Sequence, residues 1–252
     1  MVLAGLVQDP PPGALTVSKW YTISRRGFRE DGRMSADQPF EPEADRVARI
    51  VREQIIDGDR TPGDRLVERD LAAELGVSRV PVRDALKALI AEGLVTPRPR
   101  TWAVVRTFTD ADVDDLIEVR SALETLTFRL AAERRTPDEV AALEAVLDRE
   151  ARAARDHDAK AAHRAGADFH ELVATTAASP LLDEIGAITA SRLRWLLGQH
   201  LDLEEMVDEH RGLLAAIRAG DGQEAARLAV GHVQTSRDAA RARRAAQGPA
   251  RG

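Results

Sequence analysis

The chain has 252 residues, 44% of them hydrophobic, and a net charge of −6, which suits one or two globular domains. The absence of cysteine excludes disulfides and thiolate zinc sites and is typical of a reducing interior. Since no run approaches the roughly 20 apolar residues of a membrane span and the start lacks a signal-peptide pattern, we expect a cytoplasmic protein with no membrane partner.

The N-terminal part is predicted to be a disordered tail followed by a small domain. Residues 1–43 mix proline, glycine and charge without a sustained period, which is typical of a disordered tail. From Asp45 onward, apolar residues recur at helical spacing until Gly58, which predicts a first helix. A turn-rich link follows that helix. The small domain is predicted to span residues 44–107.

Two more helices and a hairpin complete this domain. Leu71 and its neighbours predict a second helix over residues 68–75, closed by a glycine. Ser78 is a suitable N-cap for a third helix, because its hydroxyl can accept a hydrogen bond from an amide of the first turn. That helix ends at Gly93, and two short extended runs follow around a tip rich in proline and arginine. Three helices and a β-hairpin make a winged helix-turn-helix.

The rest of the chain is predicted to be an all-α bundle over residues 108–243, followed by a disordered tail at 244–252. Thr136-Pro137 and Ser179-Pro180 mark helix starts, because Ser or Thr caps a helix and proline fits its first position. The fold class is therefore mainly α. Six helices are expected in this part: 110–133, 136–157, 159–175, 179–199, 203–218 and 221–243.

A basic stripe runs along the third helix. Arg79, Arg83 and Lys87 recur every fourth residue and so share one face, beside a stripe of apolar residues that begins at Val82. Such a face is either a solvated helix surface or a recognition helix for duplex DNA, where arginine bonds guanine or phosphate. The preceding short helix, the turn and the basic hairpin favour DNA. The stretch around this domain is slightly basic, whereas the chain beyond it is acidic.

The segment "LVERDLAAELGVSRVPVRDALKALIAEGLV" resembles the DNA-binding domain of GntR-family transcriptional regulators. The resemblance implies DNA contacts from Arg69, Ser78, Arg79 and Arg83. The wing departs from the family pattern, because "RPRTWAVV" replaces the usual glycine at its tip. Arg98 and Arg100 there are candidates for minor-groove or phosphate contacts, and solvated side chains are the alternative.

The segment "FTDADVDDLIEVRSALETLTFRLAA" resembles the start of the FCD effector domain of the FadR-type subfamily. That resemblance implies a ligand-responsive regulator, expected to be a repressor, that acts as a homodimer on palindromic operator DNA and responds to a small organic acid. The long helices 110–133 and 179–199 are candidates for the dimer interface. Arg120 lies on an otherwise apolar face, so it needs a carboxylate partner. That partner is either the acid group of the effector or a protein carboxylate such as Glu124.

Three histidines, His170, His210 and His232, lie among apolar residues on three different predicted helices. Each could be a satisfied core histidine, but three in one bundle can converge on a divalent transition metal such as zinc or nickel. The resemblance implies the same site, since many FadR-type effector domains hold a metal on three histidines and an aspartate. Gly166 stands at the position of that aspartate, which puts the metal in doubt.

Two other classes of function are weighed against a regulator. Three histidines on zinc could activate water in a metal-dependent hydrolase, but no Glu or Asp stands at a motif spacing that would place an acid or base beside the metal. A helical interaction module without DNA binding would leave Arg79 and Arg83 unexplained. We therefore expect a DNA-binding regulator and not an enzyme.

Overall fold

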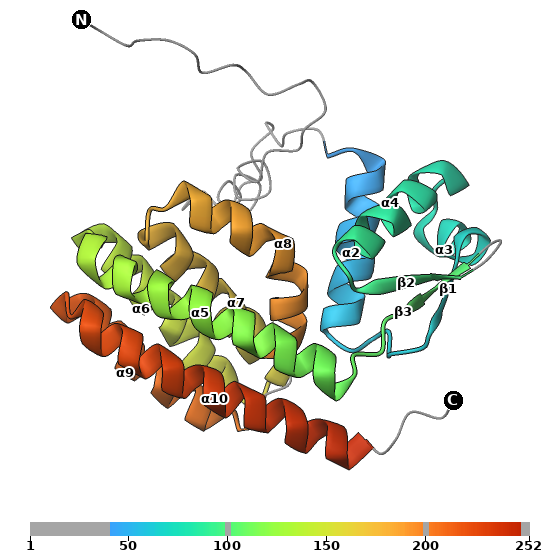
Figure 1. Ribbon diagram of the computed structural model, residues 1–252. Coiled ribbons are helices and arrows are strands. Elements are labelled where there is room, and N and C mark those ends of the chain that lie inside the picture. Colours follow the sequence, from blue (N-terminus) through green and yellow to red (C-terminus); the bar gives the residue numbers. More distant parts are fainter. Residues whose placement is uncertain (1–40, 99–101, 199–201, 248–252) are drawn as a thin grey trace, which may run out of the picture. The chain divides into compact units, whose positions relative to one another are not determined.

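The computed structural model describes residues 41–98, 102–198 and 202–247, and its elements are labelled in Figure 1. The predicted tail at 1–43 falls almost entirely outside these residues, and so do Arg100 and the last part of the predicted tail at 244–252. The last helix continues to Gln247, a few residues beyond its predicted end.

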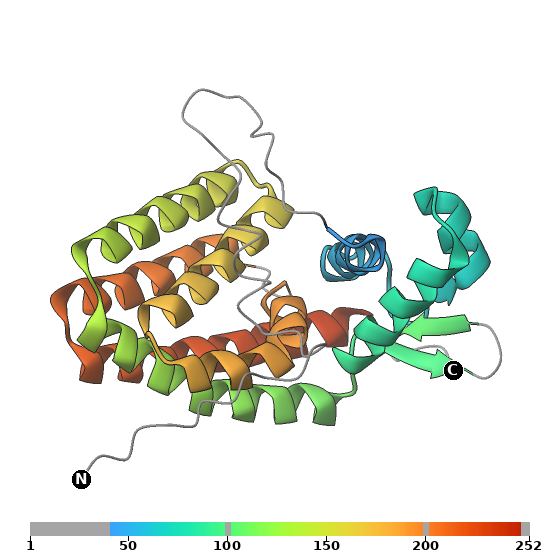
Figure 2. The same cartoon turned by 90° about the horizontal axis from the view of Figure 1, so that it is seen from above.

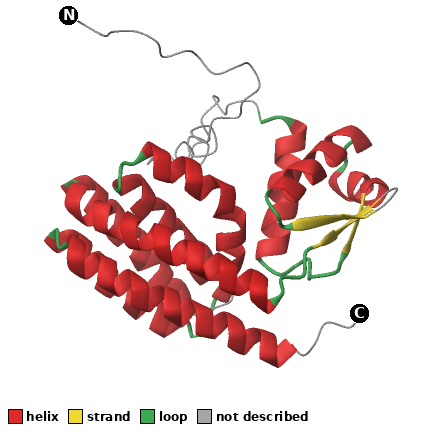
Figure 3. Ribbon diagram, viewed as in Figure 1, coloured by secondary structure: helices red, strands yellow, loops and turns green. Residues whose placement is uncertain are grey.

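The first elements form the winged helix-turn-helix that the sequence predicts. Three helices are joined by a small antiparallel sheet with the strand order β1-β3-β2 (Figure 3). The hairpin of β2 and β3 is as expected. The elements in chain order are α2 (Glu43–Ile56), β1 (Arg65–Val67), α3 (Glu68–Leu75), α4 (Arg79–Ala91), β2 (Val95–Arg98) and β3 (Trp102–Val105).

The sequence pattern does not predict strand β1, because its residues lie in the stretch that is expected to be a turn-rich link. It is only three residues long, too short to show an alternating pattern. Its central residue, Leu66, is fully buried and pairs with Ala103 of β3. Through this single buried leucine, the link between α2 and α3 packs against the wing.

All six helices expected in the C-terminal part are present among the described residues. Thr136 closes a capping box with Glu139 at the start of α6, as a helix-start signal predicts. Ser179 occupies the corresponding position before α8 but makes no side-chain capping bond. The helices are α5 (Asp110–Arg134), α6 (Pro137–Arg155), α7 (Ala159–Thr176), α8 (Pro180–Leu197), α9 (Leu203–Ala219) and α10 (Gly222–Gln247).

The helices pack as antiparallel neighbours around an apolar core. Both views show α5 running beside α10 (Figures 1 and 2), and α6 packs along α7. The interior of this part contains two buried phenylalanines, Phe128 and Phe169, among aliphatic side chains such as Leu143 and Leu213. Within the described ranges, every helix is too short or too polar to cross a membrane.

Candidate functional sites

Helix α4 has one buried and one exposed face. The apolar stripe that begins at Val82 is buried in the small domain's core, as predicted, and its other members are Ala85, Leu86 and Leu89. Arg79, Arg83 and Lys87 lie on the other face, with more than half of each side chain exposed. The helix therefore presents three cations from a surface that its own packing holds rigid.

A carboxylate from the preceding helix holds two of these cations. Glu68, the first residue of α3, accepts hydrogen bonds from Arg83 Nε and Nη2, both at 3.0 Å, and from Arg79 Nη2 at 3.3 Å. The hydrogen bond from Arg83 is the main reason why the pKa of Glu68 is lowered. Sequence reasoning missed this pairing, which fixes the direction of both guanidinium groups.

The N-terminal end of α4 differs from the prediction at Ser78 and exposes an apolar residue, Val80. Ser78 occupies the N-cap position, but its side chain makes no capping hydrogen bond, contrary to the prediction. Its backbone already leads into the helix in an extended conformation. Val80, which follows Arg79, is 64% exposed, so an apolar side chain stands among the cations. Apolar groups at such positions can contact the methyl group of thymine.

Two other candidate residues of the small domain, Arg69 and Arg98, are exposed. Arg69 on α3 donates a hydrogen bond from Nε to its neighbour Asp70 at 2.9 Å, and both side chains are largely open to solvent. Arg98 is exposed at the end of β2. The other candidate of the wing, Arg100, lies in the part of the chain that the structure does not describe.

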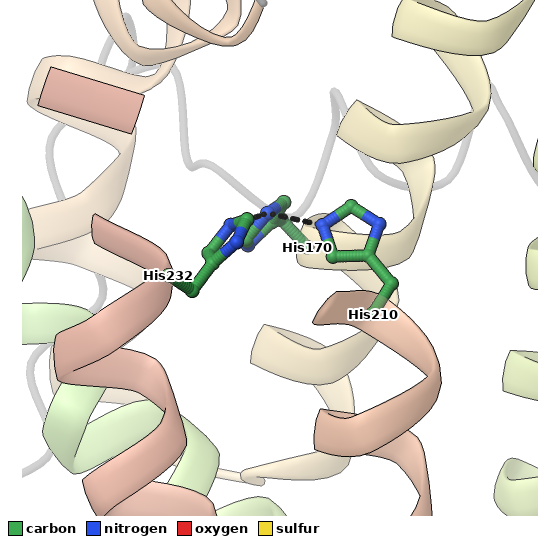
Figure 4. Close-up of side chains that lie close together, drawn as sticks. All are labelled: His170, His210 and His232. Carbon is green, nitrogen blue, oxygen red and sulfur yellow. Dashed lines mark hydrogen bonds between the residues drawn. The ribbon is translucent and has the colours of Figure 1, made fainter. Parts of the chain in front are cut away.

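The three histidines of the bundle meet in its interior (Figure 4). His170 comes from α7, His210 from α9 and His232 from α10. The Nε2 atom of His170 lies 3.3 Å from Nε2 of His210 and 3.1 Å from Nε2 of His232. Among the described residues, these three offer ligand atoms within 4.8 Å of one another. We call them the histidine cluster.

Each ring of the histidine cluster has a carboxylate close to its Nδ1 atom. Glu150 contacts Nδ1 of His210 with both oxygens, at 2.8 and 2.9 Å, and Glu209 contacts Nδ1 of His232 at 2.7 Å. Glu124 lies 3.1 Å from Nδ1 of His170, at ion-pair distance but without hydrogen-bond geometry. A carboxylate that accepts the Nδ1 proton leaves the Nε2 lone pair free to bind a metal. All three Nε2 atoms face the centre of the cluster.

Arg120 borders the histidine cluster and is fully buried. Its Nε donates to Glu124 at 2.9 Å and its Nη2 lies 3.0 Å from Nε2 of His232. Its Nη1 is buried and finds no hydrogen-bond partner among the described residues, and the same holds for the second oxygen of Glu124. The protein carboxylate foreseen as one alternative is therefore present, but it leaves one guanidinium nitrogen unsatisfied. Such a nitrogen is suited to a small anion.

Burial and charge act on two groups of the histidine cluster, His170 and Glu124. Burial lowers the pKa of His170, so the ring is unprotonated near neutral pH and can act as a metal ligand. Although burial opposes it, the Arg120 guanidinium and His170 lower the pKa of Glu124 to about 2. An unprotonated His170 beside an ionised Glu124 suits a divalent metal such as zinc or nickel.

Two acidic residues, Asp168 and Glu150, lie near Gly166, one in the sequence and one in space. Asp168, the acid nearest to it in sequence, points away from the histidine cluster and pairs with Arg149 at the surface. A Cβ atom added to Gly166 would meet an oxygen of Glu150 at 3.3 Å. The space in front of this glycine is therefore lined by a carboxylate from another helix.

Comparisons with known proteins agree on two family matches. Residues 43–105 match the model of bacterial regulatory proteins of the gntR family, and residues 115–235 match the FCD domain. The first match contains α2 to β3, with Glu68 and the exposed cations of α4. The second contains the histidine cluster and Arg120.

Individual relatives cover most of the chain. An HTH-type transcriptional regulator of Mycobacterium tuberculosis, Rv0494, is 32% identical in an alignment of 214 residues that covers 76% of this chain and 87% of that protein. The galactonate operon transcriptional repressor of Escherichia coli is 26% identical, over 76% of this chain and 94% of its own. A GntR transcriptional regulator from Rhodococcus sp. RHA1 superposes with a TM-score of 0.68 at 26% identity, over 79% of this chain and 97% of that one.

Proposed function

The chain belongs to the GntR family of bacterial regulatory proteins and, with its FCD domain, to the FadR-type subfamily, and from this we propose that it is a transcriptional repressor that binds operator DNA and responds to a small carboxylic acid. The observation that carries the DNA-binding part is the exposed basic face of α4, built on a buried apolar face. Such a regulator works where the DNA is, in the bacterial cytoplasm.

In this proposal, α4 lies in the major groove with its N-terminal half against the bases. Arg79 and Arg83 read base edges or clamp phosphates, and Lys87 contacts the backbone farther along. Ser78 and Arg69 border the same groove, and Arg98 and Arg100 follow the wing to a neighbouring groove or phosphate. Glu68 keeps the two guanidinium groups directed outward before DNA arrives, which lowers the entropy lost on binding.

The histidine cluster is proposed to hold a divalent metal, zinc or nickel. His170, His210 and His232 would provide the three nitrogen ligands. The bound metal would supply a Lewis-acidic position for one oxygen of the effector. Arg120 is proposed to receive the carboxylate of the effector through its unsatisfied Nη1. The hydrolase hypothesis gains no support from the comparisons, because the relatives are regulators.

The dimer is proposed to form through helix α8. Leu181, Ile185 and Ile188 recur on one side of this helix and are exposed, although apolar rows of this kind normally mark an interface. Helix α5 was the other candidate for the dimer interface, and its Val119 is also exposed. A two-fold operator needs a two-fold protein, and an isologous contact would cover the same row on both copies.

Replacing Ile188 by glutamate is expected to break this dimer. Ile188 is 67% exposed in the single chain, so the change costs little in the monomer but buries a charge in the interface. We expect a monomeric protein in sedimentation or light scattering, with at least about tenfold weaker operator binding because the two half-sites are no longer bound together. The matched change Val230→Glu, on α10 and 50% exposed, should leave the dimer intact. Identical mass distributions for the two variants would contradict α8 as the interface.

The proposed function is tested by titrating the protein with duplex DNA from upstream of its own gene. Because each neutralised phosphate releases counterions, the logarithm of the binding constant should fall linearly with the logarithm of salt concentration. Binding should exceed that to random DNA by roughly 10³-fold or more. If every fragment of the upstream region is bound no more tightly than random DNA, the proposal of an operator-binding repressor is contradicted.

A further inference from the structure

Glu150 is a fully buried carboxylate that is hydrogen-bonded to His210. It comes from α6, which contributes no ligand to the histidine cluster, and both of its oxygens lie within 2.9 Å of Nδ1 of His210. A buried carboxylate is costly unless its charge is balanced. A carboxylate held against Nδ1 makes the Nε2 atom of the same ring a better metal ligand, so this pair is suited to a cation on the far side of the ring.

The contact also determines what His210 presents to the centre. When Glu150 accepts the Nδ1 proton, the ring keeps the tautomer whose Nε2 carries a lone pair. That Nε2 lies 3.3 Å from Nε2 of His170 (Figure 4). The ring is further fixed by stacking on Phe169, with the ring centroids 4.7 Å apart. Glu150 and Phe169 together leave His210 one orientation.

The place of Glu150 depends on the absence of a side chain at position 166. A Cβ there would lie 3.3 Å from Oε1 of Glu150, which is tight for a methyl group, and 3.5 Å from Cε1 of His210, which is an ordinary contact. A larger acidic side chain at Gly166 would bring a second negative charge against Glu150. The space beside His210 therefore holds one carboxylate, and in this chain α6 provides it.

We propose that Glu150 is the positioning residue of the histidine cluster: through His210 it supplies the negative charge that metal binding requires, and Gly166 is small so that it can do so. This inference rests on the proposed metal binding. It implies that a carboxylate at position 150 and one at position 166 are alternatives that exclude each other.

The test is a double-mutant cycle with metal affinity as the readout. Zn²⁺ or Ni²⁺ is titrated in competition with a chromophoric chelator into the full-length wild type, Glu150→Gln, Gly166→Asp and the double variant. Glutamine keeps the shape and the acceptor oxygen but loses the charge, so Glu150→Gln should bind metal about 10- to 100-fold more weakly. Glu144→Gln, at an exposed position of the same helix, is the matched control and should bind like the wild type.

The second arm of the cycle tests the exclusion. Gly166→Asp alone should lower the melting temperature of the metal-free protein, because two carboxylates then share one buried space. In the Glu150→Gln background the same change should cost less stability and should recover part of the lost metal affinity. Equal and additive effects of Gly166→Asp in both backgrounds would overturn the exclusion.

The outcomes separate this inference from the function on which it rests. If the wild type binds metal and Glu150→Gln binds it equally well, the role of Glu150 is wrong and the metal site stands. If Glu150→Gln only lowers the melting temperature, its role is structural and the inference is again wrong. If the wild type binds no metal, the metal proposal and this inference both fail, whereas the DNA-binding proposal is untouched.

Discussion

Replacing Arg83 by alanine is expected to weaken operator binding by at least about 30-fold, since each half-site of a dimeric complex loses one charged, base-reading side chain. The Arg83 side chain is 53% exposed, so its removal leaves the core of the small domain intact. Two of its nitrogens are held by Glu68, and the remaining N–H groups point away from that carboxylate. Random DNA should lose less affinity than the operator, so the specificity ratio falls.

Arg227→Ala is a matched control for this experiment. Arg227 on α10 is also exposed, and Glu224 holds it through Nε and Nη2 in the same two-bond geometry. Both variants therefore lose one cation and one bidentate pair, but only one of them lies on α4. Fluorescence anisotropy with labelled operator and with a scrambled duplex gives the two affinities. If the two variants bind operator equally well, α4 is not the reading helix.

The sequence predicted those features that depend on neighbours along one helix. The spacing of Val82, Leu86 and Leu89 determines which face of α4 is buried, and so it also determines that Arg83 is exposed. The six helices of the C-terminal part follow from the same periodicity and from capping signals such as Thr136. The arrival of three histidines at one place was foreseen only as a hypothesis, from their apolar surroundings and a family resemblance.

The features that sequence reasoning missed depend on contacts between distant segments. Glu150 lies on a helix that carries no cluster histidine and meets His210 sixty positions later in the chain. The pairing of Glu68 with Arg83 likewise crosses the turn between two helices. A glutamate in a helix ordinarily signals a solvated face, and no periodic pattern separates one that is buried against a histidine. Only packing shows which acid is inside.

Removal of His170 is expected to abolish the metal site altogether. Its Nε2 takes part in both short contacts of the histidine cluster, so it is the nitrogen that His210 and His232 share. With His170→Ala, two nitrogens remain where a tetrahedral metal needs three or four protein ligands. We expect affinity for Zn²⁺ or Ni²⁺ to fall by more than the roughly 10- to 100-fold that the loss of an outer partner causes.

The control for this change is His163→Ala on the same helix, which removes an imidazole that is not part of the histidine cluster. Both variants are purified, incubated with Zn²⁺ or Ni²⁺, desalted and assayed for bound metal.

A thermal-shift screen of small carboxylic acids follows, with and without metal, because a ligand that binds the native state raises its melting temperature. Acids that stabilise the wild type only with metal should have no effect on His170→Ala and an undiminished effect on His163→Ala. Less than about a tenth of an equivalent of metal in the wild type after incubation would refute the metal site. An acid that still stabilises His170→Ala would instead assign its binding to Arg120 alone, whose buried Nη1 has no hydrogen-bond partner within the described ranges.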